Sequence, residues 1–236
     1  MILKIFTGIA LLLQFIASYV FRPKQTKTDK GKTLITPPGS TFGLCWSLIY
    51  LLSIAQLIYI CIVWDDNSQM AIFITQIVMA VLNSLWLIFF ERFENQVWQL
   101  IDMILLYGVL IYHLTFTRTI TKLGDILIKI FSSVYTGWIT QALMLSIVIV
   151  SKQYNLMNEL YLCRTLLLIS VAFDIIITFT LYSGYVCFSQ LITLITTFPS
   201  LSDQFLRISA VMGMVIDIAI IILQIVYEVI TWQKQN

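Results

Sequence analysis

The sequence predicts an all-α protein, a bundle of helices that crosses a membrane several times. Hydrophobic residues make up 59% of its 236 residues and charged residues 11%, whereas an ordinary soluble domain is roughly 45–50% apolar and about 25% charged. The mean hydropathy is +0.92. Apolar stretches of about 20 residues, enough for one membrane helix, recur along the chain. These observations exclude a soluble enzyme, a disordered chain and a secreted disulfide scaffold.

Each membrane helix is predicted from one uninterrupted apolar stretch. The first stretch follows Lys4 and is similar to a secretory signal peptide, but we interpret it as a retained helix. The stretches long enough to cross a bilayer are residues 2–21, 42–63, 70–90, 97–116, 126–150, 160–181 and 205–230. The loops are too short to hold a soluble core, so any activity must occur in the membrane, at its surface or through partner proteins.

The apolar run from residue 160 to residue 198 is too long for a single crossing. Ser183, Gly184 and Tyr185 are its turn-like interruption. We therefore expect a short, tilted helix over residues 185–198, ended by Pro199, which cannot continue a helix. This division gives eight spans, and a single long helix over 160–198 would give seven.

Loop charge predicts that the amino terminus lies on the outer side, because Lys and Arg concentrate inside. With this orientation nine of these residues lie inside, five of them in the loop 22–41, and five lie outside. The net charge of +2 provides no strong field for nucleic acid. We expect membrane lipids and other membrane protein subunits as partners, and no nucleic acid.

Charged side chains at membrane depth are costly and usually have a role in packing or function. Asp174 and Asp217 lie near the middle of their spans, whereas Lys129 and Asp102 lie nearer span ends and are expected to extend toward the interface. The two aspartates either serve a cation or proton path, or are protonated or hydrogen-bonded to neighbouring hydroxyl groups. His113 is the only histidine, and the four cysteines form no C-x-x-C pair, so we predict no metal site, no disulfide and no enzyme activity.

Three tryptophans lie inside predicted spans rather than only at the membrane surface. They are Trp46, Trp86 and Trp138, and Asn83 lies about one helical turn before Trp86, on the same face. One interpretation is bulky core packing. The other is an aromatic-lined cavity for a flat apolar ligand, because ring faces stack on such molecules.

Three motifs resemble those of the translocator protein / tryptophan-rich sensory protein (TspO) family. Residues 37–50 have the sequence PPGSTFGLCWSLIY, similar to the family motif that opens the second helix. Residues 83–90 are NSLWLIFF, similar to the family's motif in the third helix, and residues 135–142 are YTGWITQA, similar to the fifth-helix motif of the family's longer branch. The motifs occur in the family's order, each in the expected span.

The resemblance implies a TspO-like core of five antiparallel helices over residues 1–150, with additional helices over residues 151–236. It also implies a cavity that binds porphyrins, sterols or synthetic aromatic ligands, with the loop 22–41 as its lid. The residues expected to line the cavity are Trp46, Tyr50, Asn83, Trp86, Tyr135 and Trp138. The lid lacks the Trp-Tyr and Lys-Pro pairs of the short form, and the fifth helix lacks that form's Pro and Asn.

Two functions follow as hypotheses. The first is a non-catalytic accessory subunit of a larger membrane complex, such as a respiratory complex of the mitochondrial inner membrane. Short loops, unpaired acids and the altered lid favour it. The second is a stand-alone binder or transporter of porphyrin, sterol or lipid. We expect no cofactor other than such a bound lipid, sterol or porphyrin.

Overall fold

The structure is a computed structural model that describes residues 2–21, 33–63, 70–92, 95–117 and 126–235. These residues form eight α-helices, one 3-10 turn and no strand, which confirms the predicted all-α class. Seven of the helices are long and apolar enough to cross a membrane. The elements are α1 (Ile2–Val20), α3 (Gly39–Val63), α4 (Met70–Arg92), α5 (Val97–Thr117), α6 (Ile126–Gln153), α7 (Glu159–Leu181), α8 (Val186–Thr197), η2 (Phe198–Ser200) and α9 (Gln204–Gln235).

The long apolar run is divided as predicted, into α7 and the short helix α8. The residue that turns the chain is Tyr182, which adopts the left-handed conformation with φ 51° at the end of α7. Pro199 lies in the 3-10 turn η2 that follows α8, so the predicted break at this proline is confirmed. One long helix over residues 160–198 is therefore excluded.

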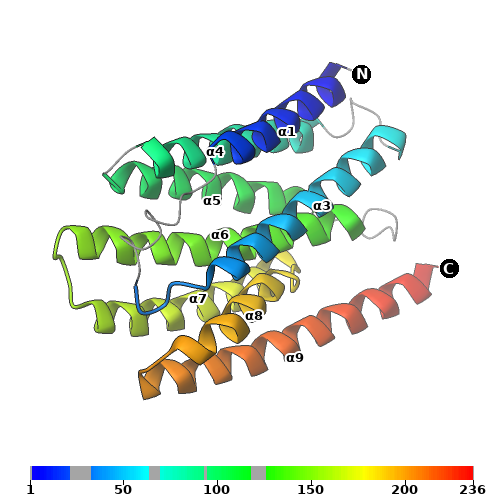
Figure 1. Cartoon of the computed structure of the whole chain (residues 1–236). Coiled ribbons are helices and arrows are strands. Elements are labelled where there is room, and N and C mark those ends of the chain that lie inside the picture. The colour runs from blue at the N-terminus through cyan, green and yellow to red at the C-terminus, as the bar shows by residue number, and fades with distance from the viewer. Residues whose placement is uncertain (1, 22–32, 64–69, 93–94, 118–125, 236) are drawn as a thin grey trace.

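Five helices form a closed ring in the amino-terminal part of the molecule. α1 packs on α4, α4 on α5, α5 on α6, α6 on α3, and α3 closes the ring against α1. Helices that follow one another in the chain run in opposite directions, so α1 and α4, which are neighbours in the ring, run in the same direction (Figure 1). This arrangement matches the five-helix bundle that the resemblance implies, and the ring's interior contains the predicted aromatic residues.

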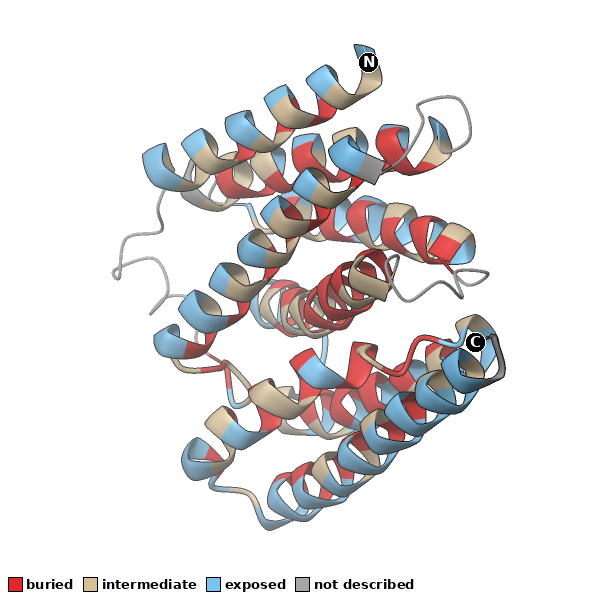
Figure 2. Cartoon of the chain, turned by 90° about the vertical axis from the view of Figure 1, so that its right-hand side faces the viewer, coloured by how far each residue is buried: buried red, intermediate tan, exposed pale blue. Residues whose placement is uncertain are grey.

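α6 is the central helix, because it also packs against α7 and α8. Ten consecutive residues, 131–140, are buried, as expected for a helix covered on all sides (Figure 2). Gly137 permits the closest approach, since a Cβ atom there would lie 2.1 Å from the carbonyl oxygen of Val186 in α8. The domain division at residue 150 stays a prediction.

α8 returns the chain between the parallel helices α7 and α9 (Figure 1). Its 12 residues correspond to about 18 Å, less than the hydrocarbon thickness of about 30 Å. The helix tolerates this length because most of it contacts protein: more than half of its residues are buried, and it packs on α6, α9, α3 and α7.

Candidate functional site: a buried aromatic cluster

The predicted cavity residues come together inside the five-helix ring, with Trp46 of α3 among them. Its ring centroid lies 5.6 Å from that of Tyr50, 6.0 Å from Trp86, 6.1 Å from Tyr135 and 6.2 Å from Trp138. These spacings are typical of interacting aromatic pairs. We call these five aromatic residues and Asn83 the aromatic cluster.

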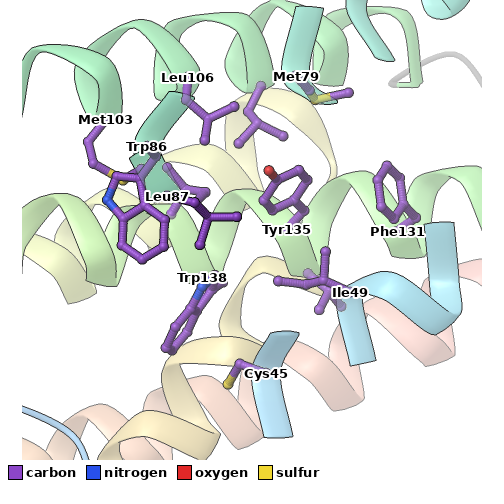
Figure 3. Packing of buried hydrophobic residues seen from close by; sticks show 13 residues of the cluster. Cys45, Ile49, Met79, Trp86, Leu87, Met103, Leu106, Phe131, Tyr135 and Trp138 are labelled. Carbon is purple, nitrogen blue, oxygen red and sulfur yellow. The ribbon is translucent and has the colours of Figure 1, made fainter. Parts of the chain in front are cut away.

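Apolar side chains of α3, α4, α5 and α6 surround the cluster (Figure 3). Trp138 is 1% exposed and Tyr135 2% exposed, whereas Trp46 and Tyr50 of α3 are only partly buried. The apolar residues around them include Cys45, Ile49, Met79, Leu87, Met103, Leu106 and Phe131. The tryptophans therefore contribute to the packing of the core, as one of the two interpretations of the sequence proposed.

Several polar atoms of the cluster are buried without a hydrogen-bond partner in the part of the chain that the structure describes. They are Trp86 Nε1, Trp138 Nε1, the Tyr135 hydroxyl and both amide atoms of Asn83. Asn83 lies near the Tyr50 hydroxyl, but its amide does not reach hydrogen-bond geometry. Each unpaired buried group costs about 1–3 kcal/mol. The cluster thus combines large apolar rings with polar atoms that a bound molecule could satisfy.

Two small cavities border the cluster. One, of about 40 Å³, is lined by Pro37, Phe42 and Trp138 together with residues of α6, α7 and α8. The other, of about 10 Å³, is bounded by Tyr135 and by polar side chains of α1, α3 and α4. Each cavity is lined by one of the six predicted residues, Trp138 in the first and Tyr135 in the second.

Part of the predicted lid lies beside the larger cavity. Ile35 and Pro37 line this cavity, and the backbone N–H of Leu34 donates to Glu159 Oε1 at 3.0 Å. That bond ties the segment before α3 to the start of α7. Residues 22–32 of the predicted lid lie outside the described residues.

Comparison with known proteins adds to this geometry. The family model described as "TSPO-like protein" matches residues 2–178, three quarters of the chain. The chain belongs to the TSPO-like family. It is also similar to the "Tryptophan-rich protein TspO" of the archaeon Archaeoglobus fulgidus, with 33% identity over 111 residues, 46% of this chain and 67% of that relative. No solved structure matches the chain.

This TSPO-like chain is a multi-pass integral membrane protein, by its family and its long apolar helices. The family match confirms the resemblance carried by the three motifs. It ends within α7, beyond the predicted core boundary at residue 150, and leaves α8 and α9 outside.

Two charged residues of this TSPO-like protein have surroundings other than those expected. Lys129 and Asp102, expected to extend toward the interface, are buried in protein, 3% and 2% exposed. Lys129 instead points to the last helix, where its Nζ lies 3.0 Å from Glu228 Oε1. Glu228 also accepts hydrogen bonds from the Tyr185 hydroxyl at 2.7 Å and from Gln224 Nε2 at 2.6 Å. A buried lysine requires an acidic partner. A search of the other predicted spans for an acid that could pair with Lys129 could therefore have indicated Glu228.

Asp174 and Asp217 lie close to each other, although they are far apart in the sequence. Asp174 belongs to α7 and Asp217 to α9, and a carboxylate oxygen of each lies within 4.8 Å of Cys187 Sγ in α8. Sequence reasoning identified both aspartates but missed Cys187 and Gln190. The polar residues of α8, in an otherwise apolar short helix, were the available signal for a buried polar site.

Proposed function

We propose that the protein binds a flat, mostly apolar molecule that carries acceptor oxygens at its edge, as porphyrins and sterols do. The observation that carries this proposal is the set of unpartnered buried polar atoms in the aromatic cluster. Indole N–H groups can only donate, so the complementary ligand presents acceptors. The surrounding rings provide stacking surfaces for its apolar body.

Binding requires the cluster to open. Ligand sites for molecules of this size measure roughly 300–1,000 Å³, whereas the adjoining cavities are about 40 and 10 Å³. Trp46 and Tyr50 are the cluster's partly exposed members, so displacement of their rings provides a route from the membrane. The unpaired polar groups favour this opening, because the ligand repays their desolvation cost.

The test is a titration of the full chain in detergent with protoporphyrin IX, followed by the porphyrin's own absorbance and by tryptophan quenching. We expect saturable binding. Tyr135→Phe removes one hydroxyl and keeps the ring, and should weaken binding about 2–10-fold, the value of one hydrogen bond. Trp138→Phe removes an indole N–H and should have an effect of similar or larger size.

Trp98→Phe is the matched control, since Trp98 is 50% exposed on α5 and lies outside the aromatic cluster. Its affinity should equal that of the wild type. A fluorescent sterol is titrated in parallel. Failure of both ligands to saturate, or equal losses in Trp98→Phe and Trp138→Phe, would contradict the proposal.

A second candidate function is favoured by the last helix. α9 has 32 residues, or about 48 Å, and it lies outside the family match. Its outward residues include Val215, Ile222 and Val226, which are 62%, 54% and 48% exposed. A long apolar face that continues past the bilayer suits contact with another subunit. We therefore also propose an accessory, non-catalytic role in a larger complex, with the mitochondrial inner membrane as its location.

This second role is tested by gentle detergent extraction from the native membrane and measurement of particle mass. An accessory subunit should migrate within a large particle and should fractionate with inner mitochondrial membranes. Migration as a free monomer or dimer would exclude it. The two tests are independent, because porphyrin binding is measured on the purified chain alone and particle mass is measured on the extract of the native membrane.

A further inference from the structure

A second buried polar site lies where α7, α8 and α9 meet, apart from the aromatic cluster. Asp174, Cys187 and Asp217 each present a ligand atom, and these three atoms all lie within 4.8 Å of one another. Each of the three residues is 0% exposed. We call these residues the three-helix cluster.

The charges of the three-helix cluster are not balanced by basic residues. Neither aspartate forms a salt bridge with a residue that the structure describes. The basic residues Lys129, Lys152 and Arg164 pair with other acids. Asp174 Oδ1 and Asp217 Oδ2 also lack any hydrogen-bond partner in the described residues. Two carboxylates buried side by side at membrane depth are costly, so a proton or a cation must offset their charge.

The amide of Gln190, which is 0% exposed, points into the cluster and fits a cation in one of its two orientations. In one, Nε2 donates to Asp174 Oδ2 at 2.6 Å and to Asp217 Oδ1 at 3.1 Å. In this orientation the amide oxygen also accepts from Ser170 Oγ at 3.1 Å and from the N–H of Val171 at 3.3 Å, so it is the orientation of the empty site. In the other, Nε2 donates to Ser170 Oγ at 3.1 Å, and the amide oxygen faces the two carboxylates. Three acceptors that face one another are unfavourable unless a positive ion lies between them.

We propose that Asp174, Cys187, Asp217 and the Gln190 amide oxygen bind one divalent metal ion of the zinc class. Binding releases the proton of the Cys187 thiol, so two carboxylates and one thiolate surround the divalent ion, and the thiolate selects a borderline or soft ion over magnesium or calcium. Ligand atoms at 2.0–2.3 Å from a tetrahedral ion lie roughly 3.3–3.8 Å apart, so ligand atoms within 4.8 Å need to close by at most about 1.5 Å. The Gln190 amide rotates between its empty and metal-bound orientations.

Sequence spacing could not indicate this site, because Asp174, Cys187 and Asp217 come from three helices and lie 13 or more positions apart in the chain. The prediction that the chain has no metal site rested on the lack of C-x-x-C and His pairs. The helix packing provides the site instead.

The experiment uses the full chain purified in detergent and stripped with a chelator. Cd²⁺ is titrated while the ultraviolet thiolate-to-cadmium charge-transfer band is recorded, and Zn²⁺ retained after gel filtration is measured by mass spectrometry. We expect one ion per chain, with a band for cadmium. Cys187→Ser should abolish the band, and Asp174→Asn and Asp217→Asn should each weaken binding about tenfold or more.

Cys163→Ser is the matched control, because Cys163 is also a buried free thiol on α7 but lies outside the three-helix cluster. Its titration should equal that of the wild type. Zn²⁺ should also raise the melting temperature of the wild type and of Cys163→Ser but not of Cys187→Ser, which tests the site even if an aspartate variant folds poorly. Absence of the band, or its persistence in Cys187→Ser, would overturn the proposal.

Discussion

The ion pair between Lys129 and Glu228 illustrates how single residues join distant parts of this chain. Both are largely buried, with side chains 4% and 11% exposed, and the pair connects α6 to α9. Lys129→Met leaves the Glu228 carboxylate without its charge partner. We expect this change to reduce the free energy of unfolding by about 3–5 kcal/mol, measured by denaturation in detergent.

The double variant Lys129→Met/Glu228→Gln provides the control, because it removes both charges. It should recover most of the loss, since replacing a complete buried pair is often nearly neutral. If the single and double variants were equally unstable, packing rather than charge would explain the effect.

Tyr135→Phe should not destabilise the ligand-free protein, because the Tyr135 hydroxyl has no hydrogen-bond partner among the described residues. We expect an unchanged free energy of unfolding, or a gain of up to about 1 kcal/mol. Tyr185→Phe is the contrast, since the Tyr185 hydroxyl donates to Glu228 at 2.7 Å, and it should lose about 1.5–3 kcal/mol. Equal losses in both variants, in thermal melts of the ligand-free chain, would show that Tyr135 has a partner.

The Arg164–Asp203 ion pair predicts a pH dependence at low pH. Arg164 Nη2 lies 2.6 Å from Asp203 Oδ2, and this hydrogen bond lowers the pKa of Asp203 below its ordinary 3.8. The carboxylate also accepts from the N–H of Leu206 at 3.0 Å, which caps α9. Because the pKa of Asp203 is lower in the folded state, its carboxylate stabilises the fold fully above pH 3.8, the ordinary pKa. This stabilisation disappears as the pH falls through the lower pKa of the folded state.

Asp203→Asn removes the titrating group. In melting curves over a pH series, the stability difference between wild type and Asp203→Asn should be constant above pH 3.8 and should shrink below it. A difference that does not change with pH would contradict the assignment.

At the residue scale, the sequence predicts groups that share a local motif and misses pairs formed across the bundle. Trp46, Trp86 and Trp138 were identified because each lies in a family motif. Glu228 and Cys187 were not, because their partners are separated from them by many residues and are defined only by helix packing. Burial of Lys129 was likewise missed, since nearness to a span end does not show what covers that end.

At the element scale, glycine position controls how closely α6 and α8 pack. Gly137→Ala would place a Cβ atom 2.1 Å from the Val186 carbonyl oxygen, so the helices must separate. We expect a loss of about 1–3 kcal/mol, the usual cost of overpacking, in unfolding measurements.

Gly108→Ala is its control on α5, because a Cβ atom there meets nothing within 4 Å. Alanine favours the helix over glycine by about 1 kcal/mol, so this variant should be neutral or more stable. Destabilisation by Gly108→Ala, or tolerance of Gly137→Ala, would be inconsistent with the packing described.

Helix positions were predictable because the bilayer requires long apolar segments, and the predicted spans match the observed helices to within a few residues. The short helix α8, predicted over residues 185–198, was located to within one residue at each end, whereas α9 continues to Gln235, five residues beyond its predicted end. Hydropathy measures length and apolarity, and α8 is short because protein rather than lipid surrounds it. The sequence placed the turn at Ser183, Gly184 and Tyr185 and did not identify Tyr182 as the residue that turns the chain. A tyrosine in the left-handed conformation has no sequence signal comparable with that of glycine.

At the scale of the whole molecule, the return through α8 places both termini at the same end of the bundle (Figure 1). Loop charge predicts that this end faces outward. Tags at the two ends should therefore show the same protease sensitivity in sealed, oriented vesicles. A tag inserted at residues 154–157, between α6 and α7, should behave in the opposite way, and differing sensitivity of the two terminal tags would show that α8 does not return the chain.

The close contact at Gly137 has a consequence for synthesis. α6 leaves the ribosome before the α8 residues that cover it, and 49 residues separate Gly137 from Val186. At the usual elongation rates this interval is roughly 2–10 s. During that time the glycine face of α6, with its neighbouring serines and threonines, has to be sheltered by the insertion machinery, so newly made chains that stop before α8 should be substrates for membrane quality control.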